Sequence, residues 1–564
     1  MKLMSLDWLI VALYMAGMLA IGFWAMTKIK DPGGYLLGKR KMGKWLMIAA
    51  LFGGGTSSNH PISVASASYK SGFSGMWISL AYMFVMPFYW LFPPIFRRAR
   101  IVTMVDFLRL RYGRFMGVLF NVVGLAHVIL VIGVGIKTSS IVIRVLTGGA
   151  VPEMWAQVAV VALILAYSLP GGILAAYTTD LIQGLLIVVL SFLLIPFLIT
   201  ETGGFQGLHA AVPPRFFEMV AAEGISTAWI VWFVVATLFS AAAWNTNSTY
   251  GTARNEIAAR MSIFGSIIKR FCTVGWMLAG IFALAIYGVG TIEGDDAFAR
   301  LAADFLPVGL RGLMLASVLA AVMSTVDANM IFASSIVTNN IYKPVFRPEA
   351  SPAHYLLAAR CAGLAAVLLG WALATQVGSV VRWVLMCEQI CGLVGVSIFG
   401  ALIWRRATHW GAIASVCVMT PLFYYGTVYR QDWTLSQWTP FYLLPGLAAF
   451  VLVSLCTRQH SLRSVREFYA RLDTPLGEEH RLAAQGIEVD LVSELDGETI
   501  EVSRADHDIS KRLWLLDFLT WPWLLLTGRA RLADYKVDLI GFFGVIAFVA
   551  LFVWGMYWLS TFGA

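Results

Sequence analysis

Long apolar runs, separated by short polar segments, repeat along almost the whole chain. A helix needs about 17 to 25 mostly apolar residues to cross the hydrocarbon core of a bilayer. Runs of this length predict about fourteen membrane-spanning helices. They lie at residues 6–27, 45–69, 74–95, 116–148, 153–170, 176–199, 226–250, 268–291, 308–341, 355–376, 383–404, 410–427, 438–456 and 537–561.

Composition supports an all-α polytopic membrane protein. Hydrophobic residues make up 59% of the 564 residues and charged residues 13%, proportions that a soluble domain of this length does not tolerate. The net charge is +9, but the basic residues form short clusters between apolar runs, so we expect no nucleic-acid partner. The six cysteines lie almost wholly in apolar runs, and we interpret them as packing residues. The expected partners are the lipid bilayer and a small solute, with no obligate protein partner.

The basic clusters also predict the topology. They recur in loops of one parity, whereas the alternate loops at 201–225 and 292–307 are poor in Lys and Arg. Because Lys and Arg concentrate in cytoplasmic loops, we expect a multi-pass protein of the plasma (inner) membrane with its N-terminus outside. The residues assigned to the later cytoplasmic clusters are Arg254, Arg260, Lys269, Arg270, Arg405 and Arg406.

One polar stretch late in the chain breaks the apolar pattern. Residues 458–512 are dense in both signs of charge, so we expect a cytoplasmic insert that is a tether, a regulator of transport or a site for a partner. The apolar segment 513–527 is short, and basic residues follow it. We therefore expect it to lie at the membrane interface rather than to span.

Polar groups inside two predicted spans indicate transport. Ser324, Thr325 and Asp327 lie deep in the run 308–341, where polar groups are costly and usually functional. Their oxygens suit a small cation, although hydroxyls can instead bond to a carbonyl one turn earlier. Glycines at 53–55 interrupt the second run, and Trp244 to Thr249 interrupt the seventh. Such breaks free backbone carbonyls as ligands, unless the glycines only permit close helix packing.

Four motifs, in order along residues 40 to 415, resemble the sodium:solute symporter family. The most specific are Gly171-Gly172 followed by Thr179, Asp180 and Gln183, and the run from Ala320 to Thr325 followed by Asp327. The other two are Thr103 with 106–108 and 111–113, and 404–408 with Gly411-Ala412.

The resemblance implies an inverted-repeat (5+5) broken-helix transporter core with its site at mid-membrane. We divide the chain accordingly. The parts are 1–44, an additional helix and basic loop; 45–225 and 226–406, the two repeats; 407–457, two accessory helices; 458–536, the polar insert; and 537–564, the last helix.

By the same resemblance, sodium is the coupling ion. Its main site would use the backbone carbonyls of Ala49, Phe52 and Ala321 and the side chains of Ser324 and Thr325. Asp180 is a candidate for a second-ion ligand, a proton carrier or a gate residue. Asp327 stands where relatives with two sodium ions often have hydroxyls, so it is a second-ion ligand, a partner for a basic residue or a contact to substrate.

The solute is less defined by the sequence. Candidate substrate residues near the expected cavity are Thr56, Ser57, Ser58, Asn59, His60, Asn245, Asn247, Glu388 and Gln389. His60 is equally consistent with a buried structural histidine. Little on the stretch 78–83 would hold a sugar, so a hexose is not favoured. Lys137 is interpreted either as a partner for Glu388 or an anionic substrate, or as a lysine reaching the interface.

The sequence therefore predicts a sodium-coupled secondary symporter that imports a small polar organic solute by alternating access. Two alternatives stay open: a proton-coupled transporter of the same fold, and a solute-binding membrane receptor that signals through the insert. The chain has no zinc-protease, serine-hydrolase or nucleotide-binding motif, so we do not expect an enzyme.

Overall fold

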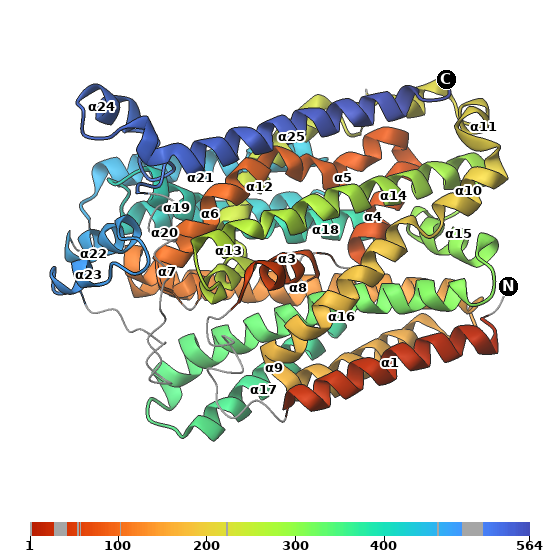
Figure 1. The fold of residues 1–564 in the computed structure, drawn as a ribbon, viewed down its shortest axis with the longest axis horizontal. Helices are drawn as coiled ribbons and strands as arrows, with labels where there is room; N and C mark the ends of the chain where they lie inside the picture. The colour runs from red at the N-terminus through yellow and green to blue at the C-terminus, as the bar shows by residue number, and fades with distance from the viewer. Residues whose placement is uncertain are drawn as a thin grey trace.

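The computed structural model describes residues 3–26, 42–53, 56, 58–101, 103–221, 224–459, 462–487 and 511–564. These residues are almost entirely helical, and their one β-feature is an isolated bridge between Met42 and Ala253. Most helices run roughly parallel to one long axis (Figure 1). Both termini lie at one end of the bundle, and α22 and α23 of the insert lie at the other.

The helices of the first part of the chain are α1 (Ser5–Met26), α3 (Lys44–Gly53), α4 (Asn59–Ser71), α5 (Trp77–Leu80), α6 (Met86–Arg98), α7 (Met104–Tyr112), α8 (Arg114–Leu146), α9 (Glu153–Phe192), α10 (Ile195–Thr202) and α11 (Gly204–Ala211). Those of the second part are α12 (Thr227–Ala243), α13 (Glu256–Met261), α14 (Ile263–Tyr287), α15 (Ala297–Phe305), α16 (Leu310–Ser335), α17 (Pro352–Ala374), α18 (Val380–Ile390) and α19 (Gly392–Ile403). The remainder are α20 (His409–Tyr424), α21 (Leu435–Cys456), α22 (Leu462–Asp473), α23 (His480–Ala483), α24 (Trp521–Leu526) and α25 (Lys536–Thr561).

The expected number of spans agrees roughly with the structure. Among the described residues, 11 helices are long and apolar enough to cross a membrane, and a bent pair makes up to 12. Two shorter apolar helices, Lys44–Gly53 and Glu153–Ala166, fall in further predicted spans. The run 153–170 and most of the run 176–199 form one 40-residue element, α9, and the end of the second run lies in α10. A proline removes one backbone donor from a helix without necessarily ending it.

Both predicted helix interruptions are present. In the first, α3 ends at Gly53 and α4 begins at Asn59. In the second, α12 ends at Ala243, and the 3-10 segment η5 (Asn245–Thr252) continues at an angle of 48°. Asn247 Nδ2 donates to the carbonyls of Ala241 and Ala242, at 2.8 and 3.1 Å. These bonds satisfy carbonyls that the end of α12 leaves without an intrahelical partner.

Two helices outside the predicted repeats, α1 and α25, carry buried carboxylates that bind to other parts of the chain. In α1, Asp7 Oδ1 accepts from the backbone N–H of Gly309 and of Gly312, at 2.7 and 2.9 Å. This contact places a negative charge at the N-terminus of α16, where the helix dipole favours it. In α25, Asp538 forms a buried ion pair with Arg260, at 2.5 Å, and accepts from the backbone N–H of Trp514.

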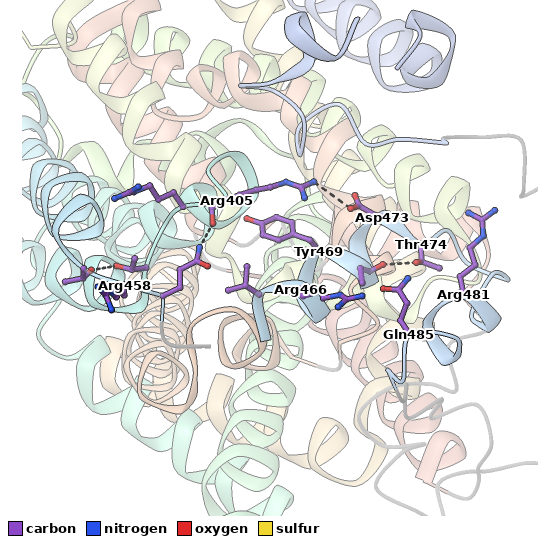
Figure 2. Close-up of a pocket in the computed structure, with 14 residues that line it drawn as sticks. Arg405, Arg458, Arg466, Tyr469, Asp473, Thr474, Arg481 and Gln485 are labelled. Carbon is purple, nitrogen blue, oxygen red and sulfur yellow. Dashed lines mark hydrogen bonds and ion pairs between the residues drawn. The ribbon is translucent and has the colours of Figure 1, made fainter. Parts of the chain in front are cut away.

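Helix α22, in the described part of the insert, packs against the end of the bundle. In α22, Phe468 is fully buried and contacts Phe107 edge to face, with ring centroids 5.0 Å apart. Tyr469 donates to the carbonyl of Ala401 at 2.7 Å. An open hollow of about 1120 Å³ lies beside these contacts (Figure 2). Its charged lining residues are Arg405, Arg406, Arg458, Arg466, Asp473 and Arg481.

Candidate functional site

The end of α3, at the first helix break, meets α16. Ser324 Oγ donates to the carbonyl of Gly53 at 3.0 Å and lies 3.3 Å from the carbonyl oxygen of Ala321. The neighbouring Thr325 is 4% exposed, and its Oγ1 has no hydrogen-bond partner. A buried hydroxyl without a partner is costly. One hydroxyl and two carbonyls are therefore gathered where α3 ends, and a second buried hydroxyl follows in the next residue of α16.

These oxygens fit a sodium ion. Ala49, Phe52 and Ala321, the other expected ligands, are all buried, the first two in the last turns of α3. Gly53 was not among the expected ligands, although it is the first of the three consecutive glycines. Carbonyl and hydroxyl oxygens bind a monovalent cation weakly enough to release it again, as transport requires.

Two carboxylates lie beside this group of oxygens. Asp180 of α9 is 1% exposed, and its Oδ1 has no hydrogen-bond partner. An added Cβ on Gly53 would lie 3.1 Å from Cβ of Asp180. Asp180 therefore lies directly against the end of α3. Asp327 of α16 is fully buried, interacts electrostatically with Asp180 and accepts from Ser168. Negative charges at this depth are suited to a cation, a proton or a gate.

A cavity of about 130 Å³ adjoins the candidate sodium ligands. Thr325, which the sequence predicts as a sodium ligand, also lines the cavity. The aromatic and apolar lining residues are Leu51, Tyr82, Tyr89, Val131, Ala241, Trp244 and Tyr250. The polar and charged ones are Asn59, His60, His127, Thr246, Asn247, Ser266, Lys269, Arg270, Thr325, Asn329 and Glu388.

Four of the expected substrate residues lie together in this cavity: Asn59, His60, Asn247 and Glu388. Asn59 Oδ1 is buried without a hydrogen-bond partner, so the amide offers a ligand a polar contact.

The other expected substrate residues lie elsewhere. Ser58 contacts the hydroxyls of Thr138 and Ser139 on α8, and Asn245 donates to the carbonyl of Gly124. Gln389 Oε1 accepts from α21 through Trp438, Thr439 and Tyr442. Thr56 is fully buried outside the cavity lining. Ser57 is outside the described residues.

Two basic residues belong to the cavity rather than to a loop. Lys269 and Arg270 lie inside α14 and line the cavity, whereas the charge pattern assigned them to a cytoplasmic cluster. The sequence does contain one sign that these residues are not loop charges. They lie within the start of the apolar run 268–291 instead of preceding it. Lys137 lies outside the cavity lining and is paired with Glu153 of α9.

Comparison with known proteins gives the family. The model of the sodium:solute symporter family matches residues 35–418. The sodium/glucose cotransporter of Vibrio parahaemolyticus is 24% identical over 74% of this chain and 84% of its own length. The high-affinity proline transporter of Bacillus subtilis is 25% identical over 81% of this chain and 99% of its own.

Solved structures show the same fold. A sodium-coupled sialic acid symporter in a substrate-bound outward-open state superposes with a TM-score of 0.70, at 16% identity, over 81% of this chain and 99% of that protein. A nucleobase-cation symporter with a bound hydantoin superposes with a TM-score of 0.53, at 11% identity, over 78% of this chain and 98% of that protein. With the broken helices and the family match, these likenesses support the inverted-repeat core. The chain belongs to the sodium:solute symporter family.

Proposed function

We propose that this protein is a sodium-coupled secondary symporter that imports a small polar organic solute by alternating access. The observation that carries the proposal is the 3.0 Å contact between Ser324 and the Gly53 carbonyl. It joins the first helix break, where α3 ends, to the middle of α16, and so links the two predicted repeats. A sodium ion held by Ala49, Phe52, Ala321, Ser324 and Thr325 would replace this contact with ligand bonds to both elements.

Thr325 connects ion and solute binding. Its hydroxyl is one of the proposed ion ligands, and the same residue lines the cavity. Ion binding that fixes its side chain also fixes part of the cavity wall, so the solute meets a pre-organised site. The two ligands would then raise each other's affinity by the same factor, as linkage requires.

The membrane potential contributes to uptake. Each positive charge that enters a negative-inside cell gains about 2.3 kcal/mol per 100 mV. In this proposal the N-terminus lies outside and the insert lies in the cytoplasm. Asp180 and Asp327 are proposed to hold a second ion or to act as a gate.

The test is uptake into proteoliposomes under separate sodium and pH gradients. Stable sodium-gradient-driven accumulation of a solute, abolished when choline replaces sodium, is the expected result. Accumulation driven by a pH gradient without sodium would favour the proton-coupled alternative. Solute binding without accumulation under either gradient would favour a receptor.

A further inference from the structure

The first helix, α1, lies outside the two predicted repeats, yet it is held closely against α16, the helix that carries Ser324 and Thr325. It runs beside α9 and α16 (Figure 1). Asp7 of α1 accepts from the backbone N–H groups of Gly309 and Gly312. An added Cβ on Gly312 would lie 2.5 Å from Cα of Asp7, so the two backbones are in close contact. The position of α1 along α16 is therefore fixed at the start of α16.

Two turns further along α1, Tyr14 contacts both helices that carry the buried carboxylates. A residue seven positions after Asp7 lies two turns away on the same side of the helix. The hydroxyl of Tyr14 donates to Sδ of Met323 in α16, at 3.7 Å. It also accepts from Nε2 of Gln183 in α9, at 3.4 Å. Tyr14 thus bridges α16 and α9.

Each of these contacts lies one helical turn from a carboxylate. Met323 precedes Asp327 by four residues, and residues at this spacing are neighbours on a helix surface. Gln183 follows Asp180 by three residues, so the same holds on α9. Tyr14 interacts electrostatically with both carboxylates, and the carboxylates interact with each other. The hydroxyl of a helix outside the repeats therefore lies beside the carboxylate pair.

The partners of Tyr14 use its hydrogen-bonding capacity only weakly. A phenol is a full O–H donor, whereas a thioether sulfur such as that of Met323 is a weak acceptor. Nearby, Oδ1 of Asp180 and Oε1 of Gln183 are buried acceptors without a hydrogen-bond partner. Unsatisfied acceptors of this kind are costly. A donor with a weak acceptor therefore lies next to acceptors that lack a donor.

We propose that Tyr14 is a positioning residue of the ion site, which donates a hydrogen bond to the pair formed by Asp180 and Asp327 when the pair holds no cation. A carboxylate that loses a cation inside a membrane needs another partner, and a hydrogen bond to a charged acceptor is among the stronger ones. When a cation binds, the carboxylate oxygens turn to it and the hydroxyl returns to Met323. The exchange stabilises the pair without its ion and so favours release of the ion.

The inference rests on the proposed sodium symport and concerns the ion near the carboxylates. Tyr14→Phe keeps the ring and removes the hydroxyl, so the pair loses a donor when the ion leaves. We expect equilibrium binding of ²²Na⁺ to tighten by about threefold or more, the effect of one hydrogen bond of ordinary strength. The maximal rate of sodium-driven uptake into proteoliposomes should fall, because the ion leaves more slowly.

Tyr469→Phe is the matched control. Tyr469 is also a buried tyrosine, but its hydroxyl donates to the backbone carbonyl of Ala401 at 2.7 Å, where α22 packs on the bundle. Its loss should lower the midpoint of thermal unfolding and leave sodium affinity unchanged. A tyrosine at position 14 that only packed α1 against its neighbours would give the same result as this control. Tighter sodium binding together with slower uptake distinguishes the proposed role.

A second measurement keeps the hydroxyl in place. The protein is prepared with 3-fluorotyrosine at position 14, and its ¹⁹F resonance is followed during titration with sodium chloride and with choline chloride. The hydroxyl exchanges partners when the cation binds, so the resonance should shift with sodium, at the midpoint of ²²Na⁺ binding, and stay in place with choline. This readout does not depend on the folding of Tyr14→Phe.

Two results would overturn the inference. They are unchanged or weaker sodium binding in a folded Tyr14→Phe protein and a fluorine resonance that does not respond to sodium. Either result leaves sodium symport standing, provided that the unmodified protein accumulates solute under a sodium gradient. If the unmodified protein shows no sodium-driven uptake while the resonance still shifts with sodium, the proposed function fails and the role of Tyr14 at a cation site remains.

Discussion

Thr325 and Asp180 are buried polar residues whose outer atoms lack hydrogen-bond partners. In a soluble core such atoms would be a defect, because an unsatisfied buried polar group costs about 1–3 kcal/mol. Here Asp180 lies against Gly53, and Thr325 is the neighbour in sequence of Ser324, whose hydroxyl contacts the Gly53 carbonyl. Oxygen atoms without hydrogen-bond partners are what a partly desolvated cation requires as ligands, and the proposed sodium site rests on them.

Asp180→Asn keeps the shape of the side chain and removes its charge. We expect turnover to fall by about tenfold or more, equivalent to about 1.4 kcal/mol, with a much smaller effect on initial solute binding. The reason is that a gate or second-ion carboxylate changes partners during the cycle. The measurement is the rate of sodium-driven uptake beside equilibrium solute binding.

Asp304→Asn is the control, because Asp304 is an exposed carboxylate that accepts from Tyr287. It should leave both quantities unchanged. Wild-type turnover in Asp180→Asn would remove Asp180 from the cycle.

At the level of single residues, the sequence predicts which side chains are polar better than it predicts which of them line the cavity. The hydroxyls of Ser324 and Thr325 stand out because they interrupt an apolar run. Ser58, Asn245 and Gln389 are equally polar, yet each bonds to a neighbouring helix instead of lining the cavity. Lys269 and Arg270 were missed because basic residues at the start of a span have the same sequence signature as loop charges. Their position at the start of the apolar run 268–291 is the one sequence signal, and the packing of α14 shows that both line the cavity.

At the scale of elements, the two helix breaks position the site. Gly53 ends α3 directly against Asp180 of α9, where an added Cβ would lie 3.1 Å from Cβ and 3.3 Å from the carbonyl oxygen of Asp180. Asn247 supports the other break by bonding to the end of α12. Both breaks were predictable from glycine and polar residues inside apolar runs.

Gly53→Ala tests the close approach. The new methyl group requires α3 or α9 to move by a few tenths of an ångström, which displaces the Gly53 carbonyl from Ser324. We expect the half-saturating sodium concentration for uptake to rise several-fold. Gly544→Ala in α25 is the matched control, because nothing lies within 4 Å of an added Cβ there. Unchanged sodium dependence in Gly53→Ala would mean that the carbonyl position is not critical.

The length of α9 is the feature that the sequence predicts least well. Proline and two glycines at 170–172 predicted a boundary between two spans, but the backbone is helical from Glu153 to Phe192. Proline and glycine lower helix stability locally, and tertiary packing decides whether the helix ends. The spans around it agree with the apolar runs because length and hydrophobicity alone define them.

At the scale of the whole molecule, buried ion pairs attach the outer helices to the core. Arg260 and Asp538, with side chains 1% and 2% exposed, join α13 to α25, and Arg98 pairs with Glu256 at 2.7 Å between α6 and α13. The sequence placed Arg260 in a cytoplasmic cluster but gave no indication of its partner 278 residues later. Long-range pairing of this kind is set by the fold and not by local pattern.

Asp538→Ala should destabilise the protein by about 3–5 kcal/mol, because it leaves the Arg260 charge buried without its carboxylate. The expected result is a clearly lower midpoint of thermal unfolding in detergent. Asp432→Ala removes the partner of Arg430 in an exposed pair, so its midpoint should match that of the unmodified protein. Equal midpoints for both variants would show that α25 is held mainly by apolar contacts.

The most direct test of the account is equilibrium binding of ²²Na⁺ to the purified protein and to the double variant Ser324→Ala/Thr325→Ala. Ser317→Ala is the control, because its hydroxyl on the same helix bonds to the Leu313 carbonyl at 2.8 Å. We predict saturable binding, displaced by unlabelled sodium and not by potassium, that survives in the control and is lost or strongly weakened in the double variant. Wild-type sodium affinity in a folded double variant, or no specific sodium binding to the unmodified protein, would contradict the account.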